Sequence, residues 1–336
     1  MYKNILASAV LVAVLHGSFA LPVDAATKKT VKKKVTYAAR RLDGVPDIST
    51  VANRWPVAAM IDNHTAARPQ AGLQEASVVY EALAEGGIPR FMAIFAQYEP
   101  KLIGPIRSVR PYFVRYAAEY PVALIHAGGS PDGQALLKKL KLFNMEGIKG
   151  PTAKYFFRQG LGTSSLFTRG SSVKTMISTA SYVKKTPTYS PWNYGAEAKL
   201  SKRVKGAHGA RVDLGAGRNY TVEYKYDRTS NSYLRFTGGR AHTDKLTRKQ
   251  IQIKNVILLF VPKEKVVDSK GRIELKTVGK GNAVLMKDGK SMTVQWSKPS
   301  DRARTKFTDK YGKEVKLNQG NTWATIVPKG RTYKVY

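Results

Sequence analysis

The sequence predicts an α+β fold: an N-terminal α/β domain with a mixed sheet, followed by a mostly antiparallel β domain that is a sandwich or barrel-like. Two patterns support this prediction. Up to about residue 190, short and nearly all-apolar runs alternate with helical patterns, as in sheets covered by helices. From about residue 199, side chains alternate with a period of two between turn residues, which is typical of antiparallel strands. With 336 residues and 43% hydrophobic residues, the chain can build two domains.

The first half of the chain contains three apolar runs that predict buried strands, Pro56–Ile61, Phe91–Tyr98 and Val122–Ala127. The run Ser77–Glu85 is ambiguous, because its β-branched start favours a strand and its alanines favour a helix. Helices are predicted at Pro111–Tyr120, Gln134–Leu142 and Ser171–Ser178. Strands alternating with helices indicate a mixed or parallel sheet with helical cover.

The second half contains seven or eight short runs that predict strands. They are Tyr220–Tyr226, Tyr233–Phe236, Asn255–Val261, Arg272–Val278, Ala283–Met286, Ser291–Trp296, Lys306–Thr308 and Trp323–Val327. Asp288-Gly289 predicts a hairpin turn between two of them.

The N-terminus is typical of a secretory signal. Lys3 precedes the apolar run Ile5–Phe19, and small-residue cleavage patterns follow. The run is shorter than the roughly 20 residues that a membrane span needs, so we expect cleavage and export. The alternative is retention by an uncleaved N-terminal helix. The predicted organisation is a signal peptide at 1–25, a basic linker at 26–41, an N-terminal α/β domain at 42–190 and a C-terminal β domain at 191–336.

The positive charge is unevenly distributed. The net charge is +34, the linker holds seven basic residues and no acidic ones, and residues 181–336 hold 34 basic and 12 acidic residues. Such a field attracts polyanions. For an exported protein, the expected partners are an acidic cell-wall polymer or an anionic membrane surface, with envelope-synthesis proteins as further candidates, and we do not expect nucleic acid. The alternative is that the charge only supports solubility or reflects a basic proteome.

Several kinds of chemistry are excluded or lack a signature. The chain has no cysteine, which excludes disulfides, thiol catalysis and thiolate metal sites. It also contains no phosphate-loop pattern, no nucleophile-elbow motif and no HExxH pair. These absences do not exclude a site assembled in space. We predict no cofactor and assign no metal ligand, and whether a divalent metal binds and whether the protein is an enzyme stay open.

Arginine dominates one stretch of a chain that otherwise prefers lysine. Trp55–Ser130 contains five arginines and one lysine, Lys101. The guanidinium group is a rigid, planar fork that suits carboxylate and phosphate groups, so this stretch predicts an anion site. The predicted ligand-binding residues are Asp62, Asn63, Arg68, Arg90, Arg107 and Arg110. The alternative is that Arg107 and Arg110 pair with Glu81 or Glu85 inside the domain.

Three further residues are candidates for catalysis, namely Glu81, Glu85 and His126. A spacing of four places both carboxylates on one face of a helix or a strand, where a pair can hold a divalent cation or divide acid and base roles. The alternative is an ion-pair network of these glutamates with Arg90. His126 ends an apolar strand, as Asp62 does, and parallel strands would place both ends at one rim. A lone histidine at a strand end is more often structural than catalytic.

Long motifs resemble a known family. RWPVAAMIDNHTAARPQAGLQEASVVYEALAEGGIPRFMAIF, IGPIRSVRPYF, ALIHAGGS and LNQGNTWATIVP are similar to the two domains of the YerB-like lipoprotein family (DUF3048), with coverage from Leu42 to Pro328. The resemblance implies a secreted or lipid-anchored two-domain envelope protein with no settled activity. Two departures stand out: the lipobox cysteine is absent, and Gly162–Leu166 replaces an expected Pro-His-Asn-like stretch.

These observations predict an exported cell-envelope binding or accessory protein that recognises an anionic ligand through its arginine-rich site. The alternative function is a hydrolase or transferase acting on phosphate- or glycan-containing envelope polymers. In that alternative, Glu81 or Glu85 is a base or metal ligand and His126 is an acid or base.

Overall fold

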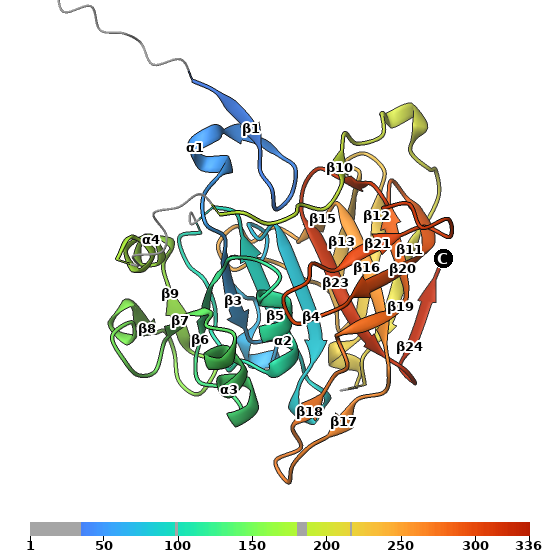
Figure 1. Ribbon diagram of the computed structural model, residues 1–336. Coiled ribbons are helices and arrows are strands. Elements are labelled where there is room, and N and C mark those ends of the chain that lie inside the picture. Colours follow the sequence, from blue (N-terminus) through green and yellow to red (C-terminus); the bar gives the residue numbers. More distant parts are fainter. Residues whose placement is uncertain (1–34, 98–99, 180–186, 216) are drawn as a thin grey trace, which may run out of the picture. The chain divides into compact units, whose positions relative to one another are not determined.

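The computed structural model describes residues 35–97, 100–179, 187–215 and 217–336 (Figure 1). Residues Thr36–Tyr336 form one compact unit. The predicted signal peptide and residues 26–34 of the predicted linker lie outside the described residues. The rest of the linker range includes β1 (Tyr37–Ala39), which pairs antiparallel with β2 (Pro46–Ile48). None of the described helices combines the length and the apolar character that crossing a bilayer requires.

A mixed sheet of ten strands forms the centre of the unit, in the order β21-β20-β19-β16-β23-β4-β5-β3-β6-β7. The first half of the chain contributes β3 (Val57–Ile61), β4 (Val78–Leu83), β5 (Pro89–Phe95), β6 (Ala123–His126) and β7 (Phe143–Glu146). The second half contributes β16 (Asn255–Val261), β19 (Gly279–Lys287), β20 (Lys290–Lys298), β21 (Lys306–Thr308) and β23 (Thr322–Pro328). β23 lies between β16 and β4 and is parallel to both, so the two halves share one sheet. The ambiguous run at Ser77–Glu85 is therefore a strand.

A second sheet is antiparallel throughout and runs in the order β14-β13-β12-β11-β24, with β15 also paired to β13. Its strands are β11 (Gly209–Asp213), β12 (Val222–Asp227), β13 (Ser232–Thr237), β14 (Arg240–Ala241), β15 (Gln252–Ile253) and β24 (Thr332–Val335). It packs on the large sheet, as the contact of 2.9 Å between the Tyr224 hydroxyl and Thr325 Oγ1 shows. The predicted α+β class with a mixed sheet and antiparallel β structure is confirmed.

Helix α2 (Pro111–Ala117) covers the opposite face of the large sheet. The Tyr116 ring stacks on Tyr80 of β4 at 4.2 Å, and the Tyr112 hydroxyl donates a hydrogen bond of 2.6 Å to the Leu83 carbonyl. Successive strand residues point to opposite faces, so Tyr80 faces the helix while Glu81 faces the second sheet. The unit therefore has three layers: helix, mixed sheet and antiparallel sheet (Figure 1).

The other helices are α1 (Ser49–Ala52), α3 (Pro131–Lys139) and α4 (Gly170–Ser178). The three predicted helices are confirmed, with shifted ends. Helix α3 begins earlier than expected because the Ser130 side chain accepts a hydrogen bond from the Gly133 amide. Short 3₁₀ turns occur at Thr65–Ala67, Glu85–Gly87, Ala153–Tyr155, Leu200–Lys202 and Arg218–Tyr220.

Three two-stranded pairs complete the described elements. They are β8 (Phe156–Arg158) with β9 (Leu166–Thr168), β10 (Tyr194–Gly195) with β22 (Leu317–Asn318), and β17 (Lys265–Val266) with β18 (Ile273–Glu274). The strand predicted at Arg272–Val278 thus shortens to the two residues of β18.

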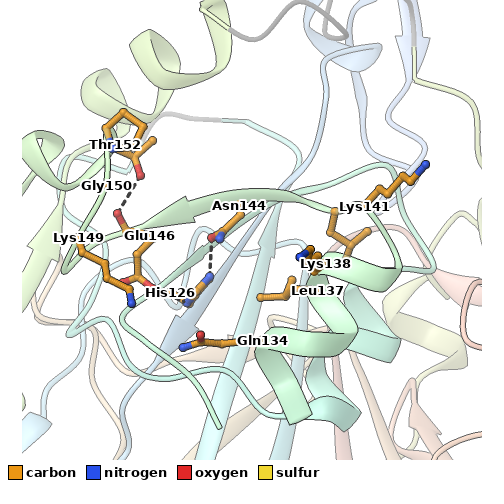
Figure 2. Close-up of a pocket in the computed structure, with 12 residues that line it drawn as sticks. His126, Gln134, Leu137, Lys138, Lys141, Asn144, Glu146, Lys149, Gly150 and Thr152 are labelled. Carbon is orange, nitrogen blue, oxygen red and sulfur yellow. Dashed lines mark hydrogen bonds and ion pairs between the residues drawn. The ribbon is translucent and has the colours of Figure 1, made fainter. Parts of the chain in front are cut away.

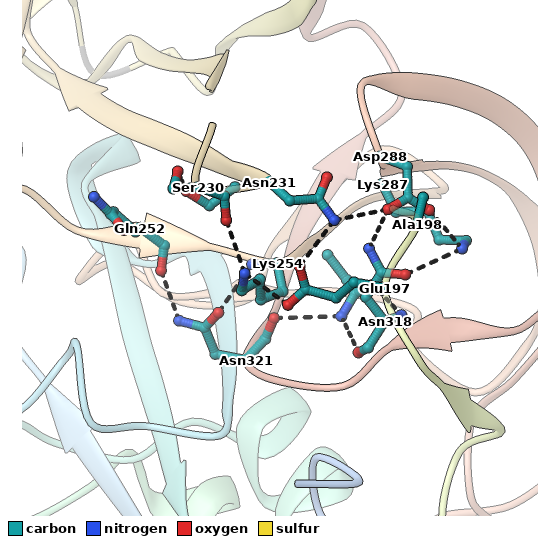
Figure 3. Close-up of polar contacts among 12 residues, drawn as sticks. Glu197, Ala198, Ser230, Asn231, Gln252, Lys254, Lys287, Asp288, Asn318 and Asn321 are labelled. Carbon is teal, nitrogen blue, oxygen red and sulfur yellow. Dashed lines mark hydrogen bonds and ion pairs between the residues drawn. The ribbon is translucent and has the colours of Figure 1, made fainter. Parts of the chain in front are cut away.

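The predicted hairpin turn between β19 and β20 is confirmed. Asp288 and Gly289 have φ angles of 54° and 75°, as expected for the turn of a two-residue hairpin. The Asp288 carboxylate accepts hydrogen bonds of 2.8 Å from both Asn231 and Asn318 and one of 3.0 Å from Lys287 (Figure 3). Burial alone would raise the pKa of Asp288, but these hydrogen bonds lower it. The turn is therefore fixed to both sheets.

Candidate functional site

Three parallel strands end at one edge of the large sheet. β3 pairs with β6, and β6 pairs with β7, in parallel register. Asp62 follows the end of β3, His126 ends β6 and Glu146 ends β7. The sequence left open whether the strands that end at Asp62 and His126 are parallel. They are, so both strand ends lie at the same edge of the sheet. Ligands of α/β sheets commonly bind beyond the carboxyl ends of such strands.

A cavity of about 480 Å³ opens beyond this edge, and we call it the Arg107 cavity. It is lined by Ile106, Arg107, Ser108, Ala127, Ile148, Arg158, Gly160, Leu161, Gly162, Thr163, Ser165 and Leu166. No carboxylate is among these lining residues. The stretch in which the family resemblance implies a Pro-His-Asn-like sequence forms part of the wall.

Asp62 positions the Arg107 side chain. Its Oδ2 lies 3.2 Å from Arg107 Nε and also accepts a hydrogen bond of 2.6 Å from the Ser164 hydroxyl. The carboxylate is buried, whereas the Arg107 side chain is 29% exposed. The terminal nitrogens Nη1 and Nη2 make no hydrogen bond to a described residue. Contact through Nε alone leaves the outer edge of the guanidinium able to meet a ligand.

The backbone of Arg107 is fixed at the strand ends. Its amide donates to the Met60 carbonyl at 2.9 Å, and its carbonyl accepts from the Ala127 amide at 3.0 Å. The segment therefore bridges the ends of β3 and β6. Arg158 is exposed in the same cavity, and its Nη1 donates a hydrogen bond of 3.0 Å to Ser165 Oγ.

Arg90 and Arg110 are paired with Glu85 away from the cavity. Glu85 lies 3.3 Å from Arg90 and also bonds Arg110 Nε. Burial alone would raise the pKa of Glu85, but the hydrogen bond from Arg110 and the charge of Arg90 lower it. Burial lowers the pKa of Arg90 to about 10. Both arginines are buried and line none of the described cavities, so the ion-pair network left open as an alternative is present at Glu85.

These two arginines also brace the segment that carries Arg107. Arg90 donates to the Ser108 carbonyl at 2.7 Å, and Arg110 donates to the Val109 carbonyl at 2.6 Å. Arg110 precedes α2 as its N-cap, and no side chain caps that helix.

Glu81 lies elsewhere, in the contact between the two sheets. Its Oε1 accepts from Arg235 at 2.7 Å, and both side chains are fully buried. Glu85 follows the end of β4 and lies in a 3₁₀ turn, so the even spacing does not place the two carboxylates on one strand face. The carboxylate pair predicted from the spacing is therefore not formed, because each glutamate has its own arginine partners.

His126 lines a separate cavity of about 470 Å³ together with Lys138, Lys141 and Lys149 (Figure 2). Its Nδ1 lies 2.8 Å from the Gly128 carbonyl, and its Nε2 lies 2.5 Å from Asn144 Oδ1. The ring is 1% exposed. Both nitrogens are thus engaged within the protein, and Glu81, Glu85 and His126 do not meet in one described cavity.

Arg68 and Asn63 lie apart from both of these cavities, and Arg68 lines a third one. Arg68 Nε donates to Asn63 Oδ1 at 3.1 Å, and Arg68 lines a cavity of about 650 Å³ that does not include Arg107. The six predicted ligand-binding residues are therefore divided into the pair Asp62 and Arg107, the pair Asn63 and Arg68, and the two arginines bound to Glu85. Among the described residues, no three His, Asp or Glu side chains gather as a metal ion would require.

Sequence reasoning missed three residues that define these sites. Arg158 and Ser164 lie in a Ser-, Thr- and Gly-rich stretch without a clear pattern, and Arg235 lies in an alternating β run. The one local signal was an isolated arginine, Arg158, among glycines and small polar residues.

The chain is a two-part α+β protein, and it belongs to the DUF3048 family. This is a family of proteins of unknown function. Residues 42–183 match its N-terminal domain, and residues 210–324 match its C-terminal domain. The chain is 30% identical over 314 residues to the "Putative lipoprotein YerB" of Bacillus subtilis (strain 168). The alignment covers 92% of each of the two chains. The crystal structure of the YerB protein from Bacillus subtilis matches with a TM-score of 0.77 and 29% identity, covering 88% of this chain and 99% of that one. The family resemblance seen in the sequence is confirmed.

Proposed function

We propose that this protein is an exported accessory protein of the cell envelope that binds an anionic group in the Arg107 cavity. The observation that carries the proposal is the Arg107 side chain, which forms an ion pair with Asp62, makes no hydrogen bond through Nε to a described residue, and lines the cavity. An arginine fork with two free terminal nitrogens suits a carboxylate or a phosphate.

The composition of the cavity wall supports an anion over a cation. Arg107 and Arg158 line it, and no acidic residue does. Asp62 is bound to Arg107 from behind and is buried, so it neutralises part of the charge while fixing the orientation of the fork. Ser108 adds a hydroxyl that can donate a hydrogen bond to an oxyanion.

Envelope location is supported by three separate features. The N-terminus is typical of a secretory signal, the similar Bacillus subtilis protein is named as a lipoprotein, and the net charge of +34 favours acidic surroundings. An acidic wall polymer or an anionic membrane surface would satisfy this charge. Within the envelope, a binding cavity without a described catalytic group is consistent with an accessory role.

The alternative of a hydrolase or transferase has no specific support among the described contacts. Glu81 is enclosed with Arg235, Glu85 is bound by two arginines, and both nitrogens of His126 are engaged. A general base needs hydrogen-bond reach to a substrate proton. None of these groups lines the Arg107 cavity.

Titration calorimetry with inorganic phosphate tests the proposal. Arg107→Ala should weaken phosphate binding by about tenfold or more, since a charge-assisted hydrogen bond contributes roughly 1.5–3 kcal/mol. Arg107→Lys should bind at an intermediate level, because it keeps the charge and loses the fork. Lys329→Ala removes one exposed charge outside the cavities and should bind normally. Equal phosphate affinity in the wild type and a folded Arg107→Ala variant would overturn the proposal.

A further inference from the structure

The cavity that contains Arg68 has the chemistry of a second anion site. It has a volume of about 650 Å³ and lies between the Thr65–Pro69 segment and the turn that joins β13 to β14. Arg68 and Arg240 line it, and no acidic residue is among its lining residues. We call it the Arg68 cavity.

Neutral groups hold the Arg68 guanidinium in place. Nε donates to Asn63 Oδ1 at 3.1 Å, Nη1 donates to the Asn219 carbonyl at 2.7 Å, and the group lies 4.8 Å from the centre of the Tyr220 ring. Amides and an aromatic ring orient a cation without cancelling its charge, unlike the carboxylate that Glu85 supplies to Arg90. A positive charge therefore remains in the cavity.

The groups behind the cavity do not remove this charge. His242 lines it, and burial together with Arg235 and Arg68 lowers the pKa of His242 well below its usual range, so the ring is neutral. Arg235 is itself matched by Glu81 at 2.7 Å. Arg68 and Arg240 thus give the cavity a net positive charge.

One buried hydroxyl is left for a ligand to satisfy. Thr237 lines the cavity and is 6% exposed, and its Oγ1 is buried with no hydrogen-bond partner among the described residues. An unsatisfied buried polar group costs roughly 1–3 kcal/mol, so such groups are rare in native proteins without a ligand or water. Since Oγ1 is shielded in the present rotamer, a rotation about χ1 would be needed for it to donate to an anionic oxygen in the cavity.

One turn connects the two cavities, although they have no lining residue in common. Asp62 holds Arg107, the next residue Asn63 holds Arg68, and consecutive Cα atoms are about 3.8 Å apart. A third hollow of about 160 Å³ shares Gly238 with the Arg68 cavity, and it is lined by Arg218 and by Arg211, which pairs with Glu223. Two basic cavities connected by one turn suit a ligand whose charges repeat along a chain.

We infer that the Arg68 cavity is a second anion-binding subsite, and that it and the Arg107 cavity hold successive charged units of one acidic polymer, such as a wall polymer with repeating phosphate or carboxylate groups. The inference rests on the proposed function of the Arg107 cavity and extends it from a single group to a chain. Binding of the second unit is then intramolecular, so affinity rises with chain length beyond either site alone.

Linear polyphosphates of defined length, compared with inorganic phosphate, test the inference on the full chain. Arg240→Ala is the main variant, because this side chain is exposed and has no hydrogen bond or ion pair with a described residue. It should weaken long-chain polyphosphate binding by about tenfold or more and leave phosphate binding at the Arg107 cavity unchanged. Arg68→Lys should have the same effect, and Lys329→Ala should have none. Thermal unfolding of each variant verifies that it is folded.

The possible outcomes separate the inference from the proposed function. If Arg107→Ala weakens polyphosphate binding and Arg240→Ala does not, the second subsite is wrong and the proposed function stands. If neither variant changes binding, both are wrong. If wild-type affinity does not rise with chain length, the two cavities do not hold one polymer. If Arg240→Ala reduces sedimentation with phosphatidylglycerol vesicles but not polyphosphate binding, the ligand is a membrane surface and the polymer inference is overturned.

Discussion

Asp62 and Asn63 are consecutive residues that position two different arginines in two different cavities. The Asp62 carboxylate lies 3.2 Å from Arg107 Nε, and the Asn63 side chain accepts from Arg68 Nε at 3.1 Å. Each of the two side chains contacts a different arginine, so one turn serves both sites. The difference in partner also matters, because a carboxylate neutralises part of the charge and an amide does not.

Removing one partner from the buried pair of Glu81 and Arg235 should strongly destabilise the fold. Arg235→Met or Glu81→Gln leaves one partner enclosed without its counter-charge, and the free energy of unfolding should fall by about 3–5 kcal/mol. Denaturant titration measures this change. The matched control is Arg211→Ala at the exposed pair with Glu223, for which we expect less than about 1 kcal/mol. Equal effects at the two pairs would contradict this prediction.

His242 should make stability depend on pH just below neutrality. Arg235 only donates, so Nδ1 of His242 accepts at 2.6 Å and Nε2 carries the proton toward Gln70 Oε1. Burial and Arg235 lower the pKa of the folded state below the ordinary 6.5, so the unfolded chain binds more protons as the pH falls through 6.5. The contribution of the neutral His242 ring to the free energy of unfolding is therefore complete above pH 6.5. As the pH decreases below 6.5, this free energy decreases by up to about 1.4 kcal/mol per pH unit.

Comparison of unfolding at pH 7.5 and pH 5.5 tests the role of His242. The loss of stability between these values, chosen to lie about one unit either side of the ordinary histidine pKa, should be smaller in His242→Gln than in the wild type. His208→Gln changes a half-buried histidine that bonds only the Lys205 carbonyl and should behave as the wild type does. An unchanged pH dependence in a folded His242→Gln variant would be evidence against a neutral buried ring.

Glu85 should act in a lower pH range. Its folded pKa is lowered from 4.5, so its contribution to stability is present above this value and is lost as the pH falls through the folded pKa. The wild type should therefore be more stable than Glu85→Gln near neutrality, and the difference should shrink in acid. Chemical denaturation across the acid range measures it, with exposed Glu314→Gln as control. A constant difference between wild type and Glu85→Gln at all pH values would refute the assignment.

Gly289 should tolerate substitution less well than another turn glycine. Its φ is 75°, and an added Cβ would lie 2.4 Å from Tyr226 Cε1. That ring cannot yield easily, because the Tyr226 hydroxyl donates to Asn231 Oδ1 at 2.8 Å. Gly312 has a similar φ of 80° with nothing within 4 Å. Gly289→Ala should lower the free energy of unfolding by about 1–3 kcal/mol more than Gly312→Ala does, and equal losses would contradict the steric argument.

Local patterns in the sequence were sufficient for most elements. Apolar runs located β3, β5 and β6, and Asp288-Gly289 located the hairpin, because periodicity and turn chemistry depend on neighbouring residues. The strand-end position of Asp62 also followed from such a run. The insertion of β23 beside β4 could not be predicted, since it depends on contacts between residues more than two hundred positions apart.

The sequence predicted which types of residue the candidate site contains, but it did not predict which of them lie together in the fold. The arginine-rich stretch does contain Arg107 and Arg68, but which guanidinium meets an acid depends on distant partners. Arg235 neutralises Glu81 from 154 positions away, and this removed one of the acids expected near the site. Arg158 joins Arg107 across the fold, and no spacing rule connects them.

The position of β23 has a consequence for how the molecule is made. A segment made more than two hundred residues after β4 fills the gap in the middle of the large sheet, with β4 on one side and β16 on the other. A chain stopped before residue 322 would have two open sheet edges that should join each other's copies or aggregate. Folding that waits for so distant a partner is expected to be slow, because the loop that must close is long.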